Sequence, residues 1–568
     1  MNIHKLNPII FILAISLFLN LFGIGWGLPD RWHPDEHVAQ TLQMIGERKI
    51  VDFYHPPFYK IVLAGYMVPF LAYFVLTQGQ AGVKLVSSCS SWIGLVRTLP
   101  DFATNIYLVA RSMSALFAVA CVYLTHRIGK AIYNEKVGLF SAMTLAATMG
   151  FVGRSHLAKE GIFVTFLVLL VLLLCISSFQ TKEWGRAKKY FLLACLFGGF
   201  SLAAKYDGGI AVVILAVTFV LLVKEKMHSN EITGKVKTSF QIAALGVLVY
   251  MLGLISGWPG LLSHFSRYKA SLMGSGYAVF SPTTNFPELM ERFFDFAKVL
   301  LASFGLPFSL LILSGLFAYI LKFKKQPKEM VMIIVMMASY FLVAIAIYNY
   351  ASIRFVIISL PLLAIFAGLG IYALYSKVKF RPISICLFTI LFVYSLAYTL
   401  RADLVFVKKD TRYECSQWIV KNIPKGASIE ITRPLYNLFS SFILDDYEVI
   451  FCGTSSQDSG FDADGFSLFY KQDIEGRKKA KEKYFAKLNQ GNISVDYIIH
   501  SSWESRFLDE GLEDLQLIKE GRNFLKNLFE GKFDYRLLKT ISYPESLFWN
   551  PRPNGTCPTI YVFKKEKI

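Results

Sequence analysis

Residues 7–28 read NPIIFILAISLFLNLFGIGWGL, and they are followed closely by Trp32-His33-Pro34-Asp35-Glu36-His37. The apolar run has the length of a membrane-spanning helix, about 20 residues. We expect it to be retained as an anchor, because no small-x-small signal cleavage site precedes its exit. The adjacent carboxylates of Asp35 and Glu36 then lie at a membrane face, where uncompensated charge is expensive and indicates chemistry or ion handling.

The composition of the 568-residue chain is that of a polytopic membrane protein. The chain is 54% hydrophobic and only 17% charged, and its mean hydropathy is +0.46. Soluble domains carry about 25% charged residues and lack repeated apolar runs of about 20 residues. With the first anchor, the sequence predicts about eleven transmembrane helices. The other ten are expected near residues 105–126, 137–153, 161–178, 189–204, 207–223, 239–257, 297–320, 329–348, 354–375 and 382–400.

One apolar segment, residues 57–77, is ambiguous. It is apolar enough to span the bilayer, but a further single crossing there would place the basic 127–136 loop outside. Parity therefore favours a segment that lies in the interface or re-enters, or one that pairs with a weak second span at 85–96. We prefer the interfacial interpretation.

The net charge of +19 is distributed over short loops and does not form one basic face. This pattern argues against nucleic-acid binding and is typical of the positive-inside rule. The loops expected in the cytoplasm are 127–136, 182–189, 224–237, 322–328 and 377–381. The regions expected to share the outer face are 30–59, 154–160, 205–207, 258–295, 348–354 and everything after Arg401.

From about Arg401 the sequence changes to that of a soluble domain. We divide the chain into a transmembrane domain, 1–400, that carries the outer loops, and an extracytoplasmic α/β domain, 401–568. The expected strands and helix are 427–432, 447–451, 495–501, 559–563 and the helix 413–422. Three cysteines of this domain face an oxidising compartment and allow one disulfide, whose pairing the spacing leaves open: Cys415, Cys452 and Cys557.

Three outer segments bring polar residues to the same side. Asp35-Glu36 precedes the amphipathic stretch 37–45, and Tyr54-His55-Pro56-Pro57-Phe58-Tyr59 repeats a proline-fixed turn with His and Tyr. Arg154-Ser155-His156-Leu157-Ala158-Lys159-Glu160 supplies a third carboxylate. For Asp35 alone a second interpretation stays open, a carboxylate that stabilises the start of the following helix.

Short motifs with a common order extend over nearly the whole chain. The motifs are Asp35-Glu36, His55 to Tyr59, Arg111–Phe117, Gly138–Ala142 leading to Glu160, Ala204-Lys205-Tyr206, Ile353-Arg354-Phe355 with Leu360-Pro361, Asp410-Thr411-Arg412, Trp418-Ile419, Asn422 to Gly426 and Asp496-Tyr497-Ile498. Their order and sidedness resemble the membrane glycosyltransferases of the C-type fold, specifically the dolichyl-phosphate-mannose protein mannosyltransferase and aminoarabinose transferase superfamily. Two departures are Glu160, where the family usually has Asp, and Phe355, where it has Tyr.

This resemblance implies an inverting glycosyltransferase that moves a monosaccharide from a polyprenyl-phosphate carrier to an extracytoplasmic protein, lipid or glycan acceptor. Such transfer needs a base for the acceptor hydroxyl and cations for the departing phosphate. The catalytic candidates are Asp35, which the resemblance favours as the base, Glu36 and Glu160. Lys205 and Arg354 are the phosphate candidates, with snorkelling at helix ends as their second interpretation. The other substrate-binding candidates are His55, Tyr59, Tyr206 and Arg154, although Arg154, like Arg111, also fits a structural ion pair.

A divalent metal is an open alternative for the same segments. Glu160, His55 and His156 are candidate ligands, in which carboxylates favour Mg²⁺ or Mn²⁺ and added histidines favour Zn²⁺. Isolated histidines also serve as hydrogen-bonded spacers. The resemblance places the protein in a prokaryotic plasma (inner) membrane, surrounded by membrane lipids, with the site and the C-terminal domain outside.

Two other classes of protein share part of this pattern. A transporter or flippase for lipid-linked glycans would carry charges within its spans and often an internal repeat. A non-catalytic membrane receptor would not need the carboxylates of separate loops. Convergence of the acidic and basic candidates on one site favours the enzyme.

Overall fold

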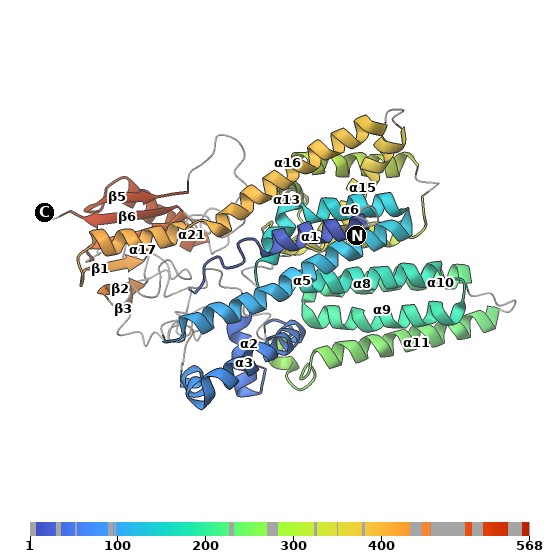
Figure 1. The fold of residues 1–568 in the computed structure, drawn as a ribbon, viewed down its shortest axis with the longest axis horizontal. Helices are drawn as coiled ribbons and strands as arrows, with labels where there is room; N and C mark the ends of the chain where they lie inside the picture. The colour runs from blue at the N-terminus through green and yellow to red at the C-terminus, as the bar shows by residue number, and fades with distance from the viewer. Residues whose placement is uncertain are drawn as a thin grey trace, which may run out of the picture.

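The chain is described by a computed structural model, whose elements are labelled in Figure 1. The described residues are 7–29, 36–50, 54–88, 95, 98–226, 232–269, 282–322, 326–348, 350–377, 381–431, 446–451, 454–455, 495–502, 515–543 and 559–566. Asp35 lies outside them, as do Cys452 and Cys557.

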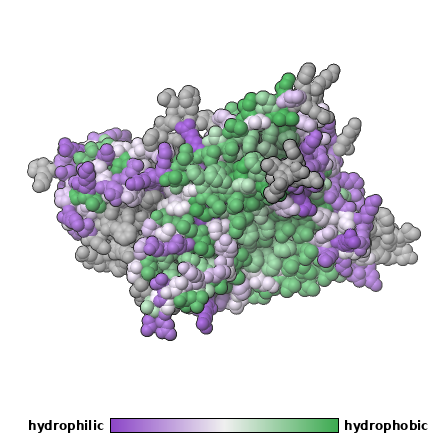
Figure 2. Space-filling view, in the orientation of Figure 1, coloured by the Kyte–Doolittle hydropathy of each residue, from purple (hydrophilic) through white to green (hydrophobic). Residues whose placement is uncertain are grey.

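Apolar helices of different lengths form a bundle that makes up most of the molecule (Figure 1). They are α1 (Pro8–Leu21), α5 (Pro100–Ile132), α6 (Glu135–Ala146), α7 (Met149–Ser155), α8 (Glu160–Gln180), α9 (Trp184–Ala204), α10 (Ala211–Lys226), α11 (Ile232–Gly257), α13 (Phe286–Leu321), α14 (Met330–Ile347), α15 (Ser359–Lys377) and α16 (Arg381–Val407). In the part of the chain that the structure describes, 10 helices are long and apolar enough to span a membrane, or up to 11 if the bent pair counts as one span. An apolar belt covers this part of the surface (Figure 2). The prediction of a polytopic helical fold is confirmed.

The first apolar run and the predicted span 137–153 are not single straight helices of the expected length. The first apolar run forms a helix of only 14 residues, α1, because the chain turns after Leu21 through Gly23. Gly23 has φ +83°, and a Cβ there would lie 2.7 Å from Phe406, so glycine allows α16 to pass close by. The predicted span 137–153 is divided into α6 and α7, which are bent by 61°. The carbonyl of Ala147, at the bend, accepts a hydrogen bond from Thr399 of α16 at 2.8 Å.

The ambiguous segment forms α3 (Phe58–Ser88), preceded by the amphipathic helix α2 (Val38–Glu47). Residues 58–82 of α3 satisfy the length and hydropathy of a span. In Figure 1, α2 and α3 lie at the end of the bundle nearest α17, beyond the ends of α8 and α9. The interfacial placement of this segment stays a prediction.

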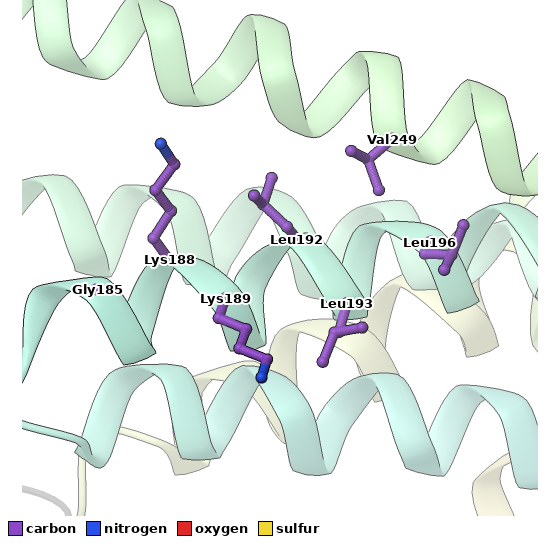
Figure 3. A pocket seen from close by; sticks show the side chains of 7 residues that line it. All are labelled: Gly185, Lys188, Lys189, Leu192, Leu193, Leu196 and Val249. Atoms are coloured by element: carbon purple, nitrogen blue, oxygen red, sulfur yellow. The ribbon is translucent and has the colours of Figure 1, made fainter.

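The basic loops meet at one end of the bundle, which we call the basic end. The contacts that join them are Tyr133 to Gln326, Lys136 to Tyr375, Lys328 to Glu225, and Gln180 to the carbonyl of Ala131. A cavity of about 350 Å³ at this end is lined by Lys188 and Lys189, whose amines point to opposite sides (Figure 3). The opposite end of the bundle, which we call the site end, carries the polar candidates.

The C-terminal region contains α17 (Thr411–Asn422), α21 (Leu515–Phe529) and a six-stranded sheet. The strand order is β3-β2-β1-β4-β6-β5, with β1 parallel to both β2 and β4, and the other pairs antiparallel. The strands are β1 (Ser428–Ile431), β2 (Glu448–Phe451), β3 (Thr454–Ser455), β4 (Tyr497–Ser501), β5 (Tyr535–Ile541) and β6 (Ile560–Lys565). α16 continues past residue 400 to Val407, so the domain boundary at 400/401 stays a prediction.

Cys415 is buried in the core beside this sheet and its thiol is free. The disulfide that the spacing allows among the three outer cysteines stays a prediction. The remaining pair, Cys452 and Cys557, lies outside the described residues.

Candidate functional site

The segment that follows Asp35 is fixed against the loop that precedes Glu160. The backbone N–H of His37 donates to the carbonyl of Ala158 at 3.1 Å. In return, the N–H of Ala158 donates to Oε1 of Glu36 at 2.9 Å. These two contacts join parts of the chain more than 120 residues apart, so the position of residues 36–37 is set by tertiary structure.

Glu36 forms a buried, bidentate ion pair with Arg111 of α5. Nε of Arg111 lies 2.8 Å from Oε1 of Glu36, and one terminal nitrogen lies 2.7 Å from Oε2. The other terminal nitrogen donates to the carbonyls of Ile24 and Trp26 at 2.7 and 2.8 Å. Both side chains are completely buried. This planar fork compensates the desolvated carboxylate and ties the turn after α1, α5 and the residue next to Asp35 together.

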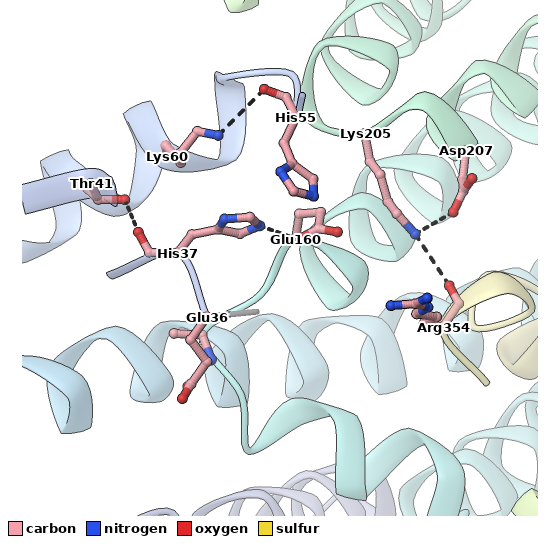
Figure 4. A network of polar contacts seen from close by, with 10 residues as sticks. Glu36, His37, Thr41, His55, Lys60, Glu160, Lys205, Asp207 and Arg354 are labelled. Atoms are coloured by element: carbon pink, nitrogen blue, oxygen red, sulfur yellow. Dashed lines mark hydrogen bonds and ion pairs between the residues drawn. The ribbon is translucent and has the colours of Figure 1, made fainter. Parts of the chain in front are cut away.

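His37 and Glu160 form a second buried contact, 2.6 Å between Nε2 and Oε2 (Figure 4). Burial lowers the pKa of His37, against the raising effect of the Glu160 carboxylate, so the ring is neutral near pH 7. A neutral ring that donates through Nε2 leaves Nδ1 as an acceptor. Nδ1 is buried and has no hydrogen-bond partner among the described residues.

Two cationic residues from two further segments, Lys205 and Arg354, lie beside this pair (Figure 4). Lys205, which follows α9, forms an ion pair with Asp207 and donates to the carbonyl of Arg354 at 3.3 Å. Lys205 also interacts electrostatically with Glu160. Tyr348 donates to Asp207 at 2.7 Å and so fixes the carboxylate that holds the amine.

The guanidinium of Arg354 is held by aromatic rings. It lies 4.6 Å from the ring centre of Phe355 and 5.3 Å from that of Tyr350. Phe355 in turn stacks on Tyr348, with ring centres 3.8 Å apart. Phe355 therefore contacts Arg354 and Tyr348 through the face of its ring, a contact that needs no hydroxyl.

Three other candidates occupy the surroundings of the site. His55 and Tyr59 pack against the ring of His37, at 4.8 and 5.8 Å between ring centres. Tyr206 packs edge-on against Trp258 at 5.9 Å. Arg154 is half-buried on α7. His55 and Tyr59 thus shape the wall next to the His37–Glu160 pair, and Tyr206 belongs to a separate aromatic cluster.

The predicted ligands Glu160, His55 and His156 are not gathered into one group in the part of the chain that the structure describes, and a divalent metal stays a prediction. The ring of His156 stacks on Phe406, and its nitrogens lie 2.9 and 2.7 Å from the carbonyls of Val152 and Phe22. Within the described ranges, no group of three or more His, Cys, Asp or Glu side chains could hold a metal ion. We derive no catalytic step through a metal.

Several site residues were missed by sequence reasoning. His37 directly follows the carboxylate pair, and Asp207 lies two residues after Lys205, so proximity to a candidate was the available signal for both. Tyr348 had no such signal beyond its place at the edge of an outer segment. Arg111 was assigned correctly to a structural ion pair, but its partner was not predicted.

We expect the stability of the protein to fall as the pH is lowered below about 6.5. An unfolded histidine takes up a proton near pH 6.5, whereas His37, facing Glu160, His55 and Lys60, does so only at lower pH. The unfolded state therefore binds more protons in this window, and acid favours it. Thermal unfolding of detergent-purified protein between about pH 5 and pH 8 measures the effect.

In the variant His37→Gln, the unfolding temperature is expected to depend less on pH than in the unmodified protein. Part of the dependence will remain, because burial also lowers the pKa of His156, to about 4. An unfolding midpoint with the same pH dependence in both proteins would contradict the assignment to His37.

Comparison with known proteins gives the fold a name. Residues 101–256 match the family described as dolichyl-phosphate-mannose-protein mannosyltransferase. The structure is similar to ArnT from Cupriavidus metallidurans bound to undecaprenyl phosphate, with TM-score 0.53 and 10% identity over 98% of this chain and 97% of that one. ArnT in the apo state gives TM-score 0.52 and 10% identity over 97% of each chain. The apo oligosaccharyltransferase of Archaeoglobus fulgidus gives TM-score 0.50 and 12% identity over 91% of this chain and 73% of that one.

No curated protein matches the chain by sequence. At identities this low, the structural likeness establishes the fold alone. The chain is a multi-pass membrane protein of the C-type glycosyltransferase fold, with a small C-terminal sheet region. Its segment 101–256 carries the match to the mannosyltransferase family, and the resemblance indicated by the motifs is confirmed.

Proposed function

We propose that this protein is an inverting glycosyltransferase that moves a monosaccharide from a polyprenyl-phosphate carrier to an acceptor at the site end of the bundle. The observation that carries the proposal is the convergence of Glu36-His37, Glu160, Lys205 and Arg354, which come from four separate parts of the chain (Figure 4). A receptor would have no need for this arrangement of carboxylates and cations. We further propose that the site end faces the outside of a prokaryotic plasma membrane, because the basic end carries the loops typical of the inner side.

Asp35 is the proposed base for the acceptor hydroxyl. Its neighbour Glu36 has both carboxylate oxygens engaged by Arg111 and Ala158, so Glu36 acts in this proposal as a positioning residue. Because Asp35 directly precedes Glu36 in the sequence, we expect the same clamp to position it. A base on one face of the sugar and a phosphate on the other produce inversion in one displacement.

The donor phosphate is assigned to Lys205 and Arg354. Loss of the sugar leaves an additional negative charge on the phosphate, which the nearby cations stabilise. Asp207 keeps the amine of Lys205 oriented before the donor arrives. Glu160 fixes His37 and, through it, the Asp35 segment.

The substitution Lys205→Gln is expected to raise KM for the sugar donor by about tenfold or more, because a charge-assisted hydrogen bond contributes about 1.5–3 kcal/mol. The assay supplies purified protein with radiolabelled polyprenyl-phosphate monosaccharides and follows release of the polyprenyl phosphate. The anomeric configuration of the product, compared with that of the donor, tests inversion in the same reactions.

A matched variant, Lys205→Gln with Asp207→Asn, removes both charges of the ion pair. It is expected to keep the raised donor KM while relieving any instability caused by the unpaired Asp207. Recovery of normal donor KM in the double variant would show that Lys205 only balances Asp207, and would remove it from phosphate binding.

A further inference from the structure

A second cavity, of about 860 Å³, lies beside the end of α2. It is open to the outside and is lined by the end of α2, by Ile61 of α3 and by the segment that follows α11. Apolar and cationic side chains both line it, among them Met44, Arg48, Lys49, Ile50, Ile61 and Arg267. None of these residues belongs to the site around Glu160, so the cavity requires its own explanation.

Two backbone features bring the walls of this cavity together. Arg48 ends α2 with φ +52°, a left-handed conformation that turns residues 48–50 away from the helix axis. Gly260 has φ +83°, and a Cβ there would lie 3.3 Å from His264 and 3.7 Å from Ile50. A glycine at this position lets the segment after α11 close onto Ile50.

The charge of the cavity favours an anion. Three cations, Arg48, Lys49 and Arg267, line it together with one carboxylate, Glu47. Lys49 is paired with Glu47 at 2.8 Å and lowers the pKa of that carboxyl by its hydrogen bond. The lining therefore carries more positive than negative charge, and the arginines Arg48 and Arg267 are of the residue type best suited to phosphate oxygens.

The surroundings of the cavity are suited to the membrane surface. Leu262 and Phe265, in the segment that forms one wall, are 77% and 60% exposed. Exposed apolar side chains such as these are stabilised when they insert into the apolar part of a bilayer. A ligand that reaches the cavity from there has an apolar part, which Met44, Ile50 and Ile61 can contact.

We propose that this cavity binds the phosphate headgroup of a membrane amphiphile other than the sugar donor. α2 has 10 residues and a length of about 15 Å, and it separates the cavity from His37 at its start. An amphiphile held there lies at the bilayer surface while the donor phosphate occupies Lys205 and Arg354. The proposal goes beyond the proposed function, because headgroup binding does not require turnover.

The test measures binding of short-chain phosphatidic acid to the purified full-length protein by native mass spectrometry. The double variant Arg48→Gln with Arg267→Gln is expected to weaken binding about tenfold or more, because two charge-assisted hydrogen bonds are lost. The control is Lys188→Gln with Lys189→Gln, which removes the same charge from the basic-end cavity, where the two amines diverge (Figure 3). The control is expected to bind within about twofold of the unmodified protein.

Two further arms define the ligand. Glycerol 3-phosphate, which has the headgroup without the chains, is expected to bind at least about tenfold more weakly, because burial of each methylene contributes about 0.8 kcal/mol. Phosphatidylcholine is expected to be insensitive to the arginine substitutions. Equal binding of glycerol 3-phosphate and phosphatidic acid would overturn the assignment to an amphiphile.

The test separates this site from the active site. Lys205→Gln is expected to leave binding of phosphatidic acid unchanged. Loss of binding in Lys205→Gln with no loss in the arginine double variant would overturn the proposal and return the phosphate to the active site. Failure of the protein to transfer sugar would affect the proposed function and leave the binding result intact.

Discussion

Replacement of Asp35 by Asn is expected to lower the rate of sugar transfer by about 10²- to 10⁴-fold, the usual contribution of a general base. The amide keeps the size of the side chain but cannot accept the proton of the acceptor hydroxyl. The unfolding temperature is expected to stay close to that of the unmodified protein, because the clamp on residues 36–37 uses Glu36, His37, Arg111 and Ala158. Turnover of a radiolabelled polyprenyl-phosphate sugar and thermal unfolding measure the two effects.

The control for this variant is Asp101→Asn, which removes an exposed carboxylate from the first turn of α5. We expect its turnover to stay within about twofold, because an exposed charge has little effect on a buried site. Normal turnover in Asp35→Asn would remove Asp35 from the role of base. His37, whose buried Nδ1 has no partner among the described residues, would then be the next residue to test.

The grouping of the basic loops at one end of the bundle could be predicted from sequence, because charge and hydropathy act locally. Short basic loops between apolar runs define one end of the bundle without knowledge of helix packing. The contacts between Tyr133 and Gln326 and between Lys136 and Tyr375 place those loops together, as expected. The carboxylates and cations of the candidate site lie at the opposite end, the site end.

The pairing within the site could not be predicted, because it depends on tertiary contacts between distant segments. His37 and Glu160 are 123 residues apart, and Arg111 and Glu36 are 75 residues apart. Many carboxylates in the outer segments were available to each partner. His156 shows the same limit, because its sequence context suggested a ligand, whereas packing on Phe406 and two backbone carbonyls occupy its ring.

The fully buried strand of the C-terminal region was predicted from sequence, and the exposed edge strand was not. β4 is buried at every residue and its apolar run was recognised, whereas β5 exposes five of its seven residues at the sheet edge. An edge strand that includes Arg536 and Lys539 has no alternating apolar pattern to detect. Backbone pairing with β6 holds these residues in a strand that their sequence does not indicate.

Replacement of Arg111 by Met is expected to have the largest effect on stability. Glu36 would remain as an unpaired charge in a completely buried position, and breaking such a pair costs about 3–5 kcal/mol. The carbonyls of Ile24 and Trp26 would also lose their donor. Thermal unfolding in detergent, together with the yield of monodisperse protein, measures this loss.

The double variant Arg111→Met with Glu36→Gln separates the charge from the packing. It removes both ions, so we expect its unfolding temperature to lie well above that of Arg111→Met, although the lost contacts to Ile24 and Trp26 keep it below the unmodified protein. Its turnover is nevertheless expected to remain low, because the residue next to Asp35 is no longer held to α5. Unfolding of both variants at the temperature of the unmodified protein would show that the Arg111–Glu36 pair does not hold this segment. A double variant that is stable and fully active would show that the position of Asp35 does not depend on the clamp.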